Sequence, residues 1–162
     1  MFYTQVMGNK QGLFKVVFSV VAAVIFSGGT SHALQAGGWY PSQVIQPSAL
    51  VARLAEKGRP RPVIIQVGFD FQYRSKHIPG AIFAGPAFRQ DGLDRLRAAV
   101  EHLPRSKEIY IYCGCCPMEE CPNVRPAYDL LTQMGFTHVK LVDLPTNFAR
   151  DWIMQGLPVT GE

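Results

Sequence analysis

The four cysteines of the chain, Cys113, Cys115, Cys116 and Cys121, lie within nine consecutive residues. They follow an apolar stretch at 109–112 that is typical of a buried strand, and a helical pattern comes directly after them. A thiol at a strand-to-helix turn meets backbone N–H groups and the positive end of a helix dipole, which stabilise a thiolate and bind anions. The arrangement therefore predicts nucleophilic sulfur chemistry on an anionic sulfur compound.

Cys113 ends the strand pattern and is the predicted nucleophile. Its thiolate would attack the outer sulfur of a donor such as thiosulfate and keep that sulfur as a persulfide, which a second nucleophile then collects. The guanidinium of Arg125 suits sulfonate oxygens, and the backbone N–H groups of Gly114, Cys115 and Cys116 are further candidates to hold the anion. The alternatives are an inert buried Cys113 and an ordinary solvated Arg125.

The remaining thiols admit three interpretations. Cys113 and Cys116 form a C-x-x-C pair, so Cys116 or Cys121 could resolve a persulfide or form a regulatory disulfide. A local disulfide could instead shape the loop and leave Cys113 free. The third interpretation is binding of Cu(I) or zinc. Because a zinc site usually draws on two separated cysteine pairs, the compact cluster favours the first two interpretations, and no cofactor or metal is expected.

The N-terminus has the layout of a secretory signal peptide. Two lysines precede an apolar run at 16–26, and Ser31 and Ala33 then fit a cleavage site after Ala33. The apolar run is too short for a membrane-spanning helix, which needs about 20 residues. We expect residues 1–33 to be removed and the protein to be periplasmic or secreted. The alternative is an uncleaved anchor, which is the one case in which a membrane contact is expected.

Composition limits the remaining classes. Residues 34–162 carry 14 basic and 12 acidic side chains, and this small excess does not favour a nucleic-acid partner. With 48% hydrophobic and 17% charged residues, the chain can bury a sizeable core. We expect a lead-in at 34–44 and one domain at 45–160.

Strand and helix patterns alternate along that domain. Strands are predicted at 63–67, 81–83, 108–112 and 139–142, and helices at 49–57, 93–103, 126–134 and 147–155, with a short helical turn within 69–76. The alternation predicts an α/β fold with a central parallel sheet and helices on both faces. In such sheets the site lies beyond the carboxyl ends of the strands, where Cys113 falls.

Four segments in order resemble the rhodanese (sulfurtransferase) family. They are H-I-P-G-A at 77–81, I-Y-I-Y-C at 109–113, M-G-F at 134–136 followed by Val139, and Trp152 with G-L-P-V at 156–159. The resemblance spans roughly 45–160. It implies a single rhodanese-like domain, a persulfide on Cys113, a small anionic sulfur donor and a thiol or protein acceptor. It also implies a structural role for His77 in its turn.

The chain departs from the family pattern around the expected site. Gln66 and Gly68 stand where the family usually has Asp and Arg, and Lys76 replaces the usual Gly before the histidine. Eleven residues separate Cys113 from Arg125, where the family usually has four. Two alternatives stay open: a non-catalytic module whose cysteine cluster binds a soft metal or a partner's thiol, and a thiol–disulfide oxidoreductase.

Overall fold

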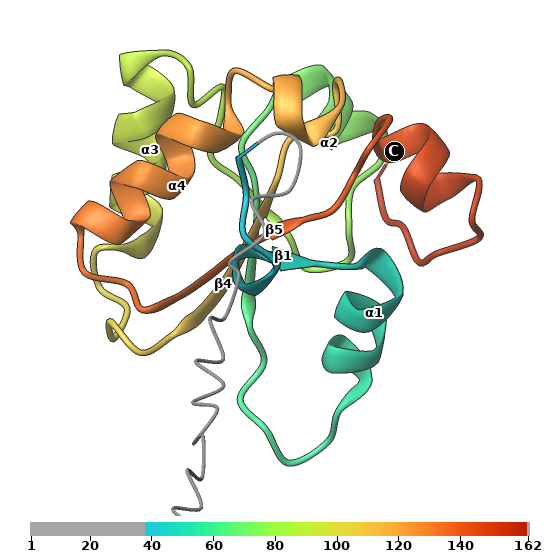
Figure 1. Ribbon diagram of the computed structural model, residues 1–162, viewed down its shortest axis with the longest axis horizontal. Helices are drawn as coiled ribbons and strands as arrows, with labels where there is room; N and C mark the ends of the chain where they lie inside the picture. Colours follow the sequence, from blue (N-terminus) through green and yellow to red (C-terminus); the bar gives the residue numbers. More distant parts are fainter. Residues whose placement is uncertain (1–37, 162) are drawn as a thin grey trace, which may run out of the picture. The chain divides into compact units, whose positions relative to one another are not determined.

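Five parallel strands form the centre of the molecule in the computed structural model, which describes residues 38–161 (Figure 1). The expected signal peptide at 1–33 lies outside the described residues. The strands are β1 (Val44–Ile45), β2 (Val63–Gln66), β3 (Ile82–Phe83), β4 (Glu108–Tyr112) and β5 (His138–Val142), in the order β1-β5-β4-β2-β3 across the sheet. Because β4 lies in the middle, the residue that follows it, Cys113, lies at the centre of the sheet's carboxyl edge, as predicted.

Helices cover both faces of this sheet, which confirms the α/β prediction (Figure 1). One face carries α3 (Gln90–Val100) and α4 (Val124–Gln133), which pack side by side. The other carries α1 (Pro47–Ala55) and a π-helical turn, η3 (Ala149–Ile153). The shorter helical segments are α2 (Asp70–Ser75), η1 (Pro41–Gln43) and η2 (Met118–Glu120). Within residues 38–161 no helix combines the length and the apolar character needed to cross a membrane.

The central strand β4 is apolar from Ile109 onward because both of its faces are buried. Successive side chains of a strand point to opposite faces. Ile109 and Ile111 accordingly belong to the core beneath α3 and α4, whereas Tyr110 and Tyr112 belong to the core beneath α1 and η3. Both faces are buried from Ile109 to Tyr112, and the one charged residue of the strand, Glu108, lies at its partly exposed start.

The described part of the expected lead-in, residues 38–44, contributes to the fold. Trp39 is only 3% exposed and packs in the core on the α4 side, and Val44 pairs with Leu141 of β5. Helix α1 begins at Pro47, two residues earlier than the periodicity predicts, because a proline at the first helical position has no N–H to leave unbonded.

Candidate functional site

The four cysteines gather at the carboxyl edge of the sheet. Cys113 follows β4 and is 3% exposed, and its Sγ lies 3.2 Å from that of Cys115. Cys115 is partly exposed, and its Sγ is 2.9 Å from that of Cys116. The Sγ atoms of Cys113, Cys115 and Cys121 all lie within 4.8 Å of one another. All four residues are free thiols, and the structure therefore brings a compact sulfur cluster to the predicted place.

Two backbone hydrogen bonds fasten the cysteine loop to the segment after β5. The N–H of Phe148 donates to the carbonyl of Gly114 at 3.1 Å, and the N–H of Met118 donates to the carbonyl of Leu144 at 3.0 Å. Gly114 has a φ of +91°, and a Cβ there would lie 2.7 Å from the Cβ of Phe148. A glycine is thus required for the chain to turn away from β4 at this point.

The two family departures in the first strand region both support Cys113. Gln66 is 2% exposed, and its Nε2 donates to the carbonyl oxygen of Cys113 at 3.0 Å. A Cβ on Gly68 would lie 2.8 Å from the Sγ of Cys113 and 2.9 Å from its carbonyl oxygen. Gln66 thus holds the backbone of the cysteine, and Gly68 leaves room for its sulfur.

Asn123 is the site residue that sequence reasoning missed. It is fully buried, its Nδ2 donates to the Sγ of Cys113 at 3.3 Å, and the same Nδ2 lies 4.0 Å from the Sγ of Cys121. Its Oδ1 accepts the backbone N–H of Phe88 at 3.1 Å, which fixes the orientation of the amide. Asn123 stands at the N-cap of α4, yet its side chain makes no capping hydrogen bond. The side-chain amide of Asn123 is thus held with its Nδ2 toward the sulfur of Cys113.

Hydrogen bonds within the cluster separate the acidities of its thiols. Donation from Cys113 lowers the pKa of Cys121 to about 5, with help from backbone N–H groups at the start of α4 and against the effect of burial. Donation from Cys113 likewise lowers the pKa of Cys115 to about 7. The pKa of Cys113 is raised, contrary to the stabilised thiolate predicted at this position, because Cys113 donates its proton to Cys115 and Cys121 and because the thiol is buried. Burial, followed by a hydrogen bond to Cys115, raises the pKa of Cys116.

A cavity of about 360 Å³ opens at the carboxyl ends of β2 and β4. Cys113, Gly114 and Cys115 line it. Lys76, which replaces the usual family glycine, is the one charged side chain among the described residues around this cavity. Phe71, another lining residue, is 69% exposed and adds apolar surface. The cavity thus offers thiols, a cation and an aromatic wall to a small anion.

Arg125 lies elsewhere, although it was predicted to hold the donor. Its side chain is exposed, and its guanidinium carbon lies 3.7 Å from the ring centroid of Trp39, which is a cation–π contact. Neither Arg125 nor Cys116, the other predicted binding residue farther along the loop, lines the cavity. The η2 turn lengthens the loop, so the polar residue that reaches the sulfur atoms is Asn123.

His77 occupies a turn, as the resemblance implies. Its Nδ1 lies 2.7 Å from the carbonyl oxygen of Tyr73, and the two rings stack at 4.0 Å. Its backbone forms an antiparallel bridge with Thr160. These contacts connect the turn to the end of the chain, and His77 does not line the cavity.

Comparison with known proteins identifies one family. The model of the rhodanese-like domain matches residues 47–144. Among solved structures, the Alr3790 protein from Anabaena sp. is 28% identical, covers 72% of this chain and 91% of its own, and superposes with a TM-score of 0.53. The BH2092 protein from Bacillus halodurans is 22% identical, with 74% and 77% covered and a TM-score of 0.57, and it shares the fold. A single-domain sulfurtransferase from Saccharomyces cerevisiae is 13% identical, with 70% and 90% covered and a TM-score of 0.49. No curated protein matches the chain significantly.

Proposed function

We propose, from the premise that this chain belongs to the rhodanese-like domain family, that it transfers or carries sulfane sulfur as a persulfide on Cys113. One observation carries the proposal: Cys113 lines a cavity at the carboxyl edge of the sheet, and its Sγ accepts a hydrogen bond from the buried amide of Asn123. The cavity, at about 360 Å³, has room for a small sulfur donor beside that thiol.

The first step forms the persulfide. The Sγ of Cys113 attacks the outer sulfur of a donor such as thiosulfate, the S–S bond within the donor breaks, and sulfite leaves with the bonding electron pair. The Sγ of Cys115, 3.2 Å away, is placed to accept the proton of Cys113 as the attack begins. Asn123 then donates to the sulfur of Cys113 as charge develops there.

The second step regenerates the free thiolate of Cys113. A thiolate of an acceptor attacks the outer sulfur of the persulfide, a new S–S bond forms on the acceptor, and Cys113 leaves as a thiolate. The acceptor is a small thiol or a protein thiol. Cys115 and Cys121 lie within 4.8 Å of the sulfur of Cys113, so either is close enough to take the sulfur first and pass it on.

The anionic donor requires a positive partner, and we assign that role to Lys76. Lys76 is one of the residues that line the cavity, whereas the guanidinium of Arg125 stacks on Trp39 outside it. Gly114 and Cys115 also line the cavity, and their backbone N–H groups are the further candidates to bind anionic oxygens. Lys76 thus takes over the anion-holding role that was predicted for Arg125.

The proposal includes export. The basic residues, apolar run and small residues at 1–33 support cleavage of a signal peptide and a periplasmic or secreted mature protein. The partners are then an anionic sulfur donor and a thiol acceptor outside the cytosol, with no nucleic acid, and with a membrane only where the signal peptide is retained.

Intact-mass measurement tests the proposal directly. Reduced protein incubated with thiosulfate should gain one sulfur, about 32 Da, that reductant removes. Cys113→Ser should abolish the gain. Cys116→Ser is the matched control and should retain it, because Cys116 does not line the cavity. Sulfur uptake by Cys113→Ser that disappears in Cys115→Ser would place the persulfide on Cys115 and overturn the assignment.

A further inference from the structure

We infer that Cys113, Cys115 and Cys121 form a three-sulfur binding site for a soft monovalent metal ion, Cu(I). Their three Sγ atoms lie within 4.8 Å of one another, and those of Cys113 and Cys115 are 3.2 Å apart. Thiolates are the ligands that favour Cu(I). The site shares Cys113 and Cys115 with sulfur transfer, but metal binding needs no sulfur donor or acceptor and can be measured without either.

The spacing of the sulfur atoms fits one ion. Three sulfur atoms that each lie about 2.3 Å from a central metal are about 4 Å apart when the geometry is trigonal. The Cys113–Cys115 separation of 3.2 Å is shorter than this, and no pair in the triad exceeds 4.8 Å, so side-chain adjustments of about 1 Å would bring the three sulfur atoms to the trigonal spacing. The ligands therefore do not need to be brought together from distant parts of the fold.

The surroundings suit a weakly hydrated ion. Cys113 and Cys121 are 3% and 5% exposed, and they pack in the same apolar core as Met118 and Val124. Asn123 lies 3.3 Å from one sulfur and 4.0 Å from another. Such an outer hydrogen-bond donor orients metal ligands, and the amide is itself held by the backbone of Phe88.

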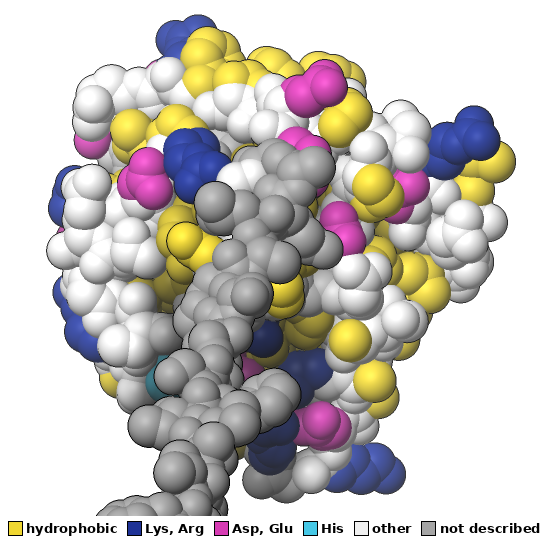
Figure 2. All heavy atoms as spheres, in the orientation of Figure 1, with side chains coloured by type: hydrophobic (Ala, Val, Ile, Leu, Met, Phe, Trp, Pro, Cys, Tyr) yellow, Lys and Arg dark blue, Asp and Glu magenta, His cyan; other side chains and the backbone are white. Residues whose placement is uncertain are grey.

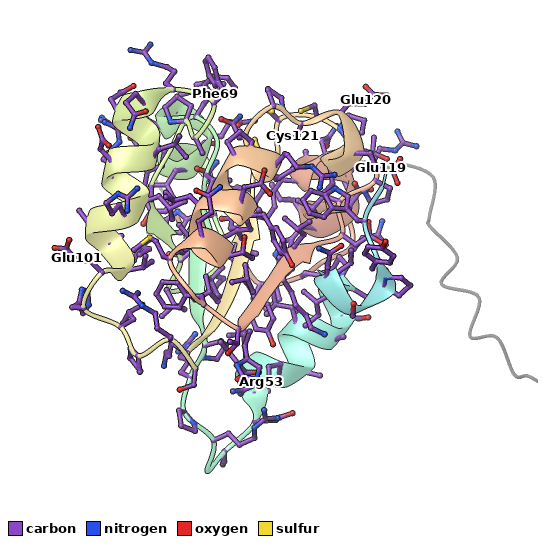
Figure 3. The ribbon with its side chains drawn as sticks, turned by 60° about the vertical axis from the view of Figure 1, so that its left-hand side comes forward. Arg53, Phe69, Glu101, Glu119, Glu120 and Cys121 are labelled. Carbon is purple, nitrogen blue, oxygen red and sulfur yellow. The ribbon has the colours of Figure 1, made fainter. Side chains whose placement is uncertain are left out.

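The donor set favours Cu(I) over zinc. Among the described residues, no carboxylate or imidazole joins the three thiols as a potential ligand. Glu119 and Glu120 are exposed, and Figure 3 shows them at the outer edge of the turn that ends at Cys121. Cys116 contacts Cys115 at 2.9 Å but does not share the mutual 4.8 Å spacing of the triad. A structural zinc ion usually takes four ligands in a tetrahedron, which this set does not provide.

Titration with Cu(I) under anaerobic conditions tests the site. The reduced chain, without a sulfur donor, is competed against bathocuproine disulfonate, and we expect one Cu(I) per chain. Cys113→Ser, Cys115→Ser and Cys121→Ser should each weaken binding by about 100-fold or more, whereas Cys116→Ser should stay within about threefold of the parent. Asn123→Ala should weaken binding by about tenfold or more, as expected for an outer-shell partner.

X-ray absorption on the Cu(I)-loaded parent chain supplies evidence that does not depend on variants folding. Three sulfur neighbours at about 2.3 Å would support the triad. A spectrum with two or four sulfur neighbours would overturn it. So would equal loss of affinity in Cys116→Ser and in the triad variants, or failure of the parent to retain copper against the competitor. The intact-mass assay measures persulfide formation, and the copper titration contains no sulfur donor. A failure of sulfur transfer is therefore distinguishable from a failure of copper binding.

Discussion

The side-chain amide of Asn123 connects the sulfur of Cys113 to a backbone group 35 residues before the asparagine. Its Nδ2 donates to the Sγ of Cys113 at 3.3 Å, while its Oδ1 accepts the N–H of Phe88 at 3.1 Å. The amide cannot turn without losing both hydrogen bonds in a fully buried position. The donor is therefore in place before charge develops on sulfur.

Replacement of this donor by a carboxylate should slow the chemistry of the cluster. Asn123→Asp keeps an acceptor for Phe88 but removes the N–H that faces Cys113. A hydrogen bond to a charged group is worth about 1.5–3 kcal/mol, so persulfide formation from thiosulfate should slow by about 10- to 150-fold. The deficit relative to the parent should shrink as the pH falls, because a protonated Asp again offers a donor. A deficit that does not change with pH would indicate a purely structural role.

Loss of the charge of Lys76 should weaken binding of an anionic donor, whereas loss of the charge of Arg125 should not. Lys76→Gln should raise the KM for thiosulfate by about fivefold, the effect of an exposed charge pair, and the effect should fade as salt is added. Arg125→Gln is the matched loss of charge and should leave KM unchanged, because Arg125 stacks on Trp39 outside the cavity. Steady-state kinetics of both variants at two ionic strengths decides between them. A larger effect from Arg125→Gln would contradict the assignment of Lys76.

Gly114 and Gly156 allow a comparison of strain with and without a steric clash. Both have positive φ, +91° and +70°, but a Cβ meets Phe148 at 2.7 Å only at Gly114, and nothing lies within 4 Å at Gly156. Gly156→Ala should lower the free energy of unfolding by about 1–2 kcal/mol. Gly114→Ala should cost about 1–3 kcal/mol more because of overpacking. Urea unfolding measures both, and equal losses would show that the loop moves away from Phe148 without cost.

The ion pair between Arg53 and Glu108 should make stability depend on pH. The hydrogen bond from Arg53 holds the pKa of Glu108 below its ordinary value of 4.5, against partial burial. A carboxyl group whose pKa is lower in the folded state stabilises the protein above the unfolded-state pKa, and this contribution is lost as the pH falls through the folded-state pKa.

Glu108→Gln should lower the free energy of unfolding by about 1–3 kcal/mol at pH 7, because the largely buried Arg53 loses its partner. The difference between parent and variant should close below about pH 4. Glu56→Gln is the control: Glu56 lies 3.6 Å from Arg53 but is 42% exposed, so its loss should have a smaller effect. Curves for parent and Glu108→Gln that stay parallel from pH 7 to pH 3 would contradict the linkage.

Export predicts a defined N-terminus. The mature protein from its native host should begin at Leu34 or within a few residues of it, because the small residues Ser31 and Ala33 precede that point. N-terminal sequencing of the extracytoplasmic fraction checks this. Protein that retains Met1 in the cytosol would contradict it.

The fold was predictable because its signals are local. Apolar runs and three- to four-residue spacings placed β2, β4, β5 and their helices within a few residues of their observed bounds. The two-residue strand β1 was not predicted, because a pair of apolar residues has no detectable period. The thiol cluster was predictable for the same reason as the longer strands, since all four cysteines belong to one short segment.

The partners of the thiols could not be predicted in the same way. The backbone N–H of Phe88 fixes the orientation of Asn123, and the ring of Trp39 holds Arg125. The position of each side chain therefore depends on a residue far away in the sequence. The fit of a guanidinium to sulfonate oxygens suggested Arg125 as the anion holder, but the η2 turn changes which side chain faces the sulfur atoms. The available signal was an asparagine three residues before the helix predicted at 126–134, and an asparagine near a helix start indicates a cap.

The two hydrogen bonds that fasten the cysteine loop, from Phe148 to Gly114 and from Met118 to Leu144, both join it to the segment after β5. The position of the cysteines is thus set partly by a segment that carries no cysteine, so the geometry of the thiols depends on residues 144–148 as well as on the loop itself. Gln66 and Asn123 contact Cys113 from two further places in the sequence. Control over the reactive sulfur is therefore distributed over the fold, and a substitution far from the cysteines along the chain can alter their chemistry.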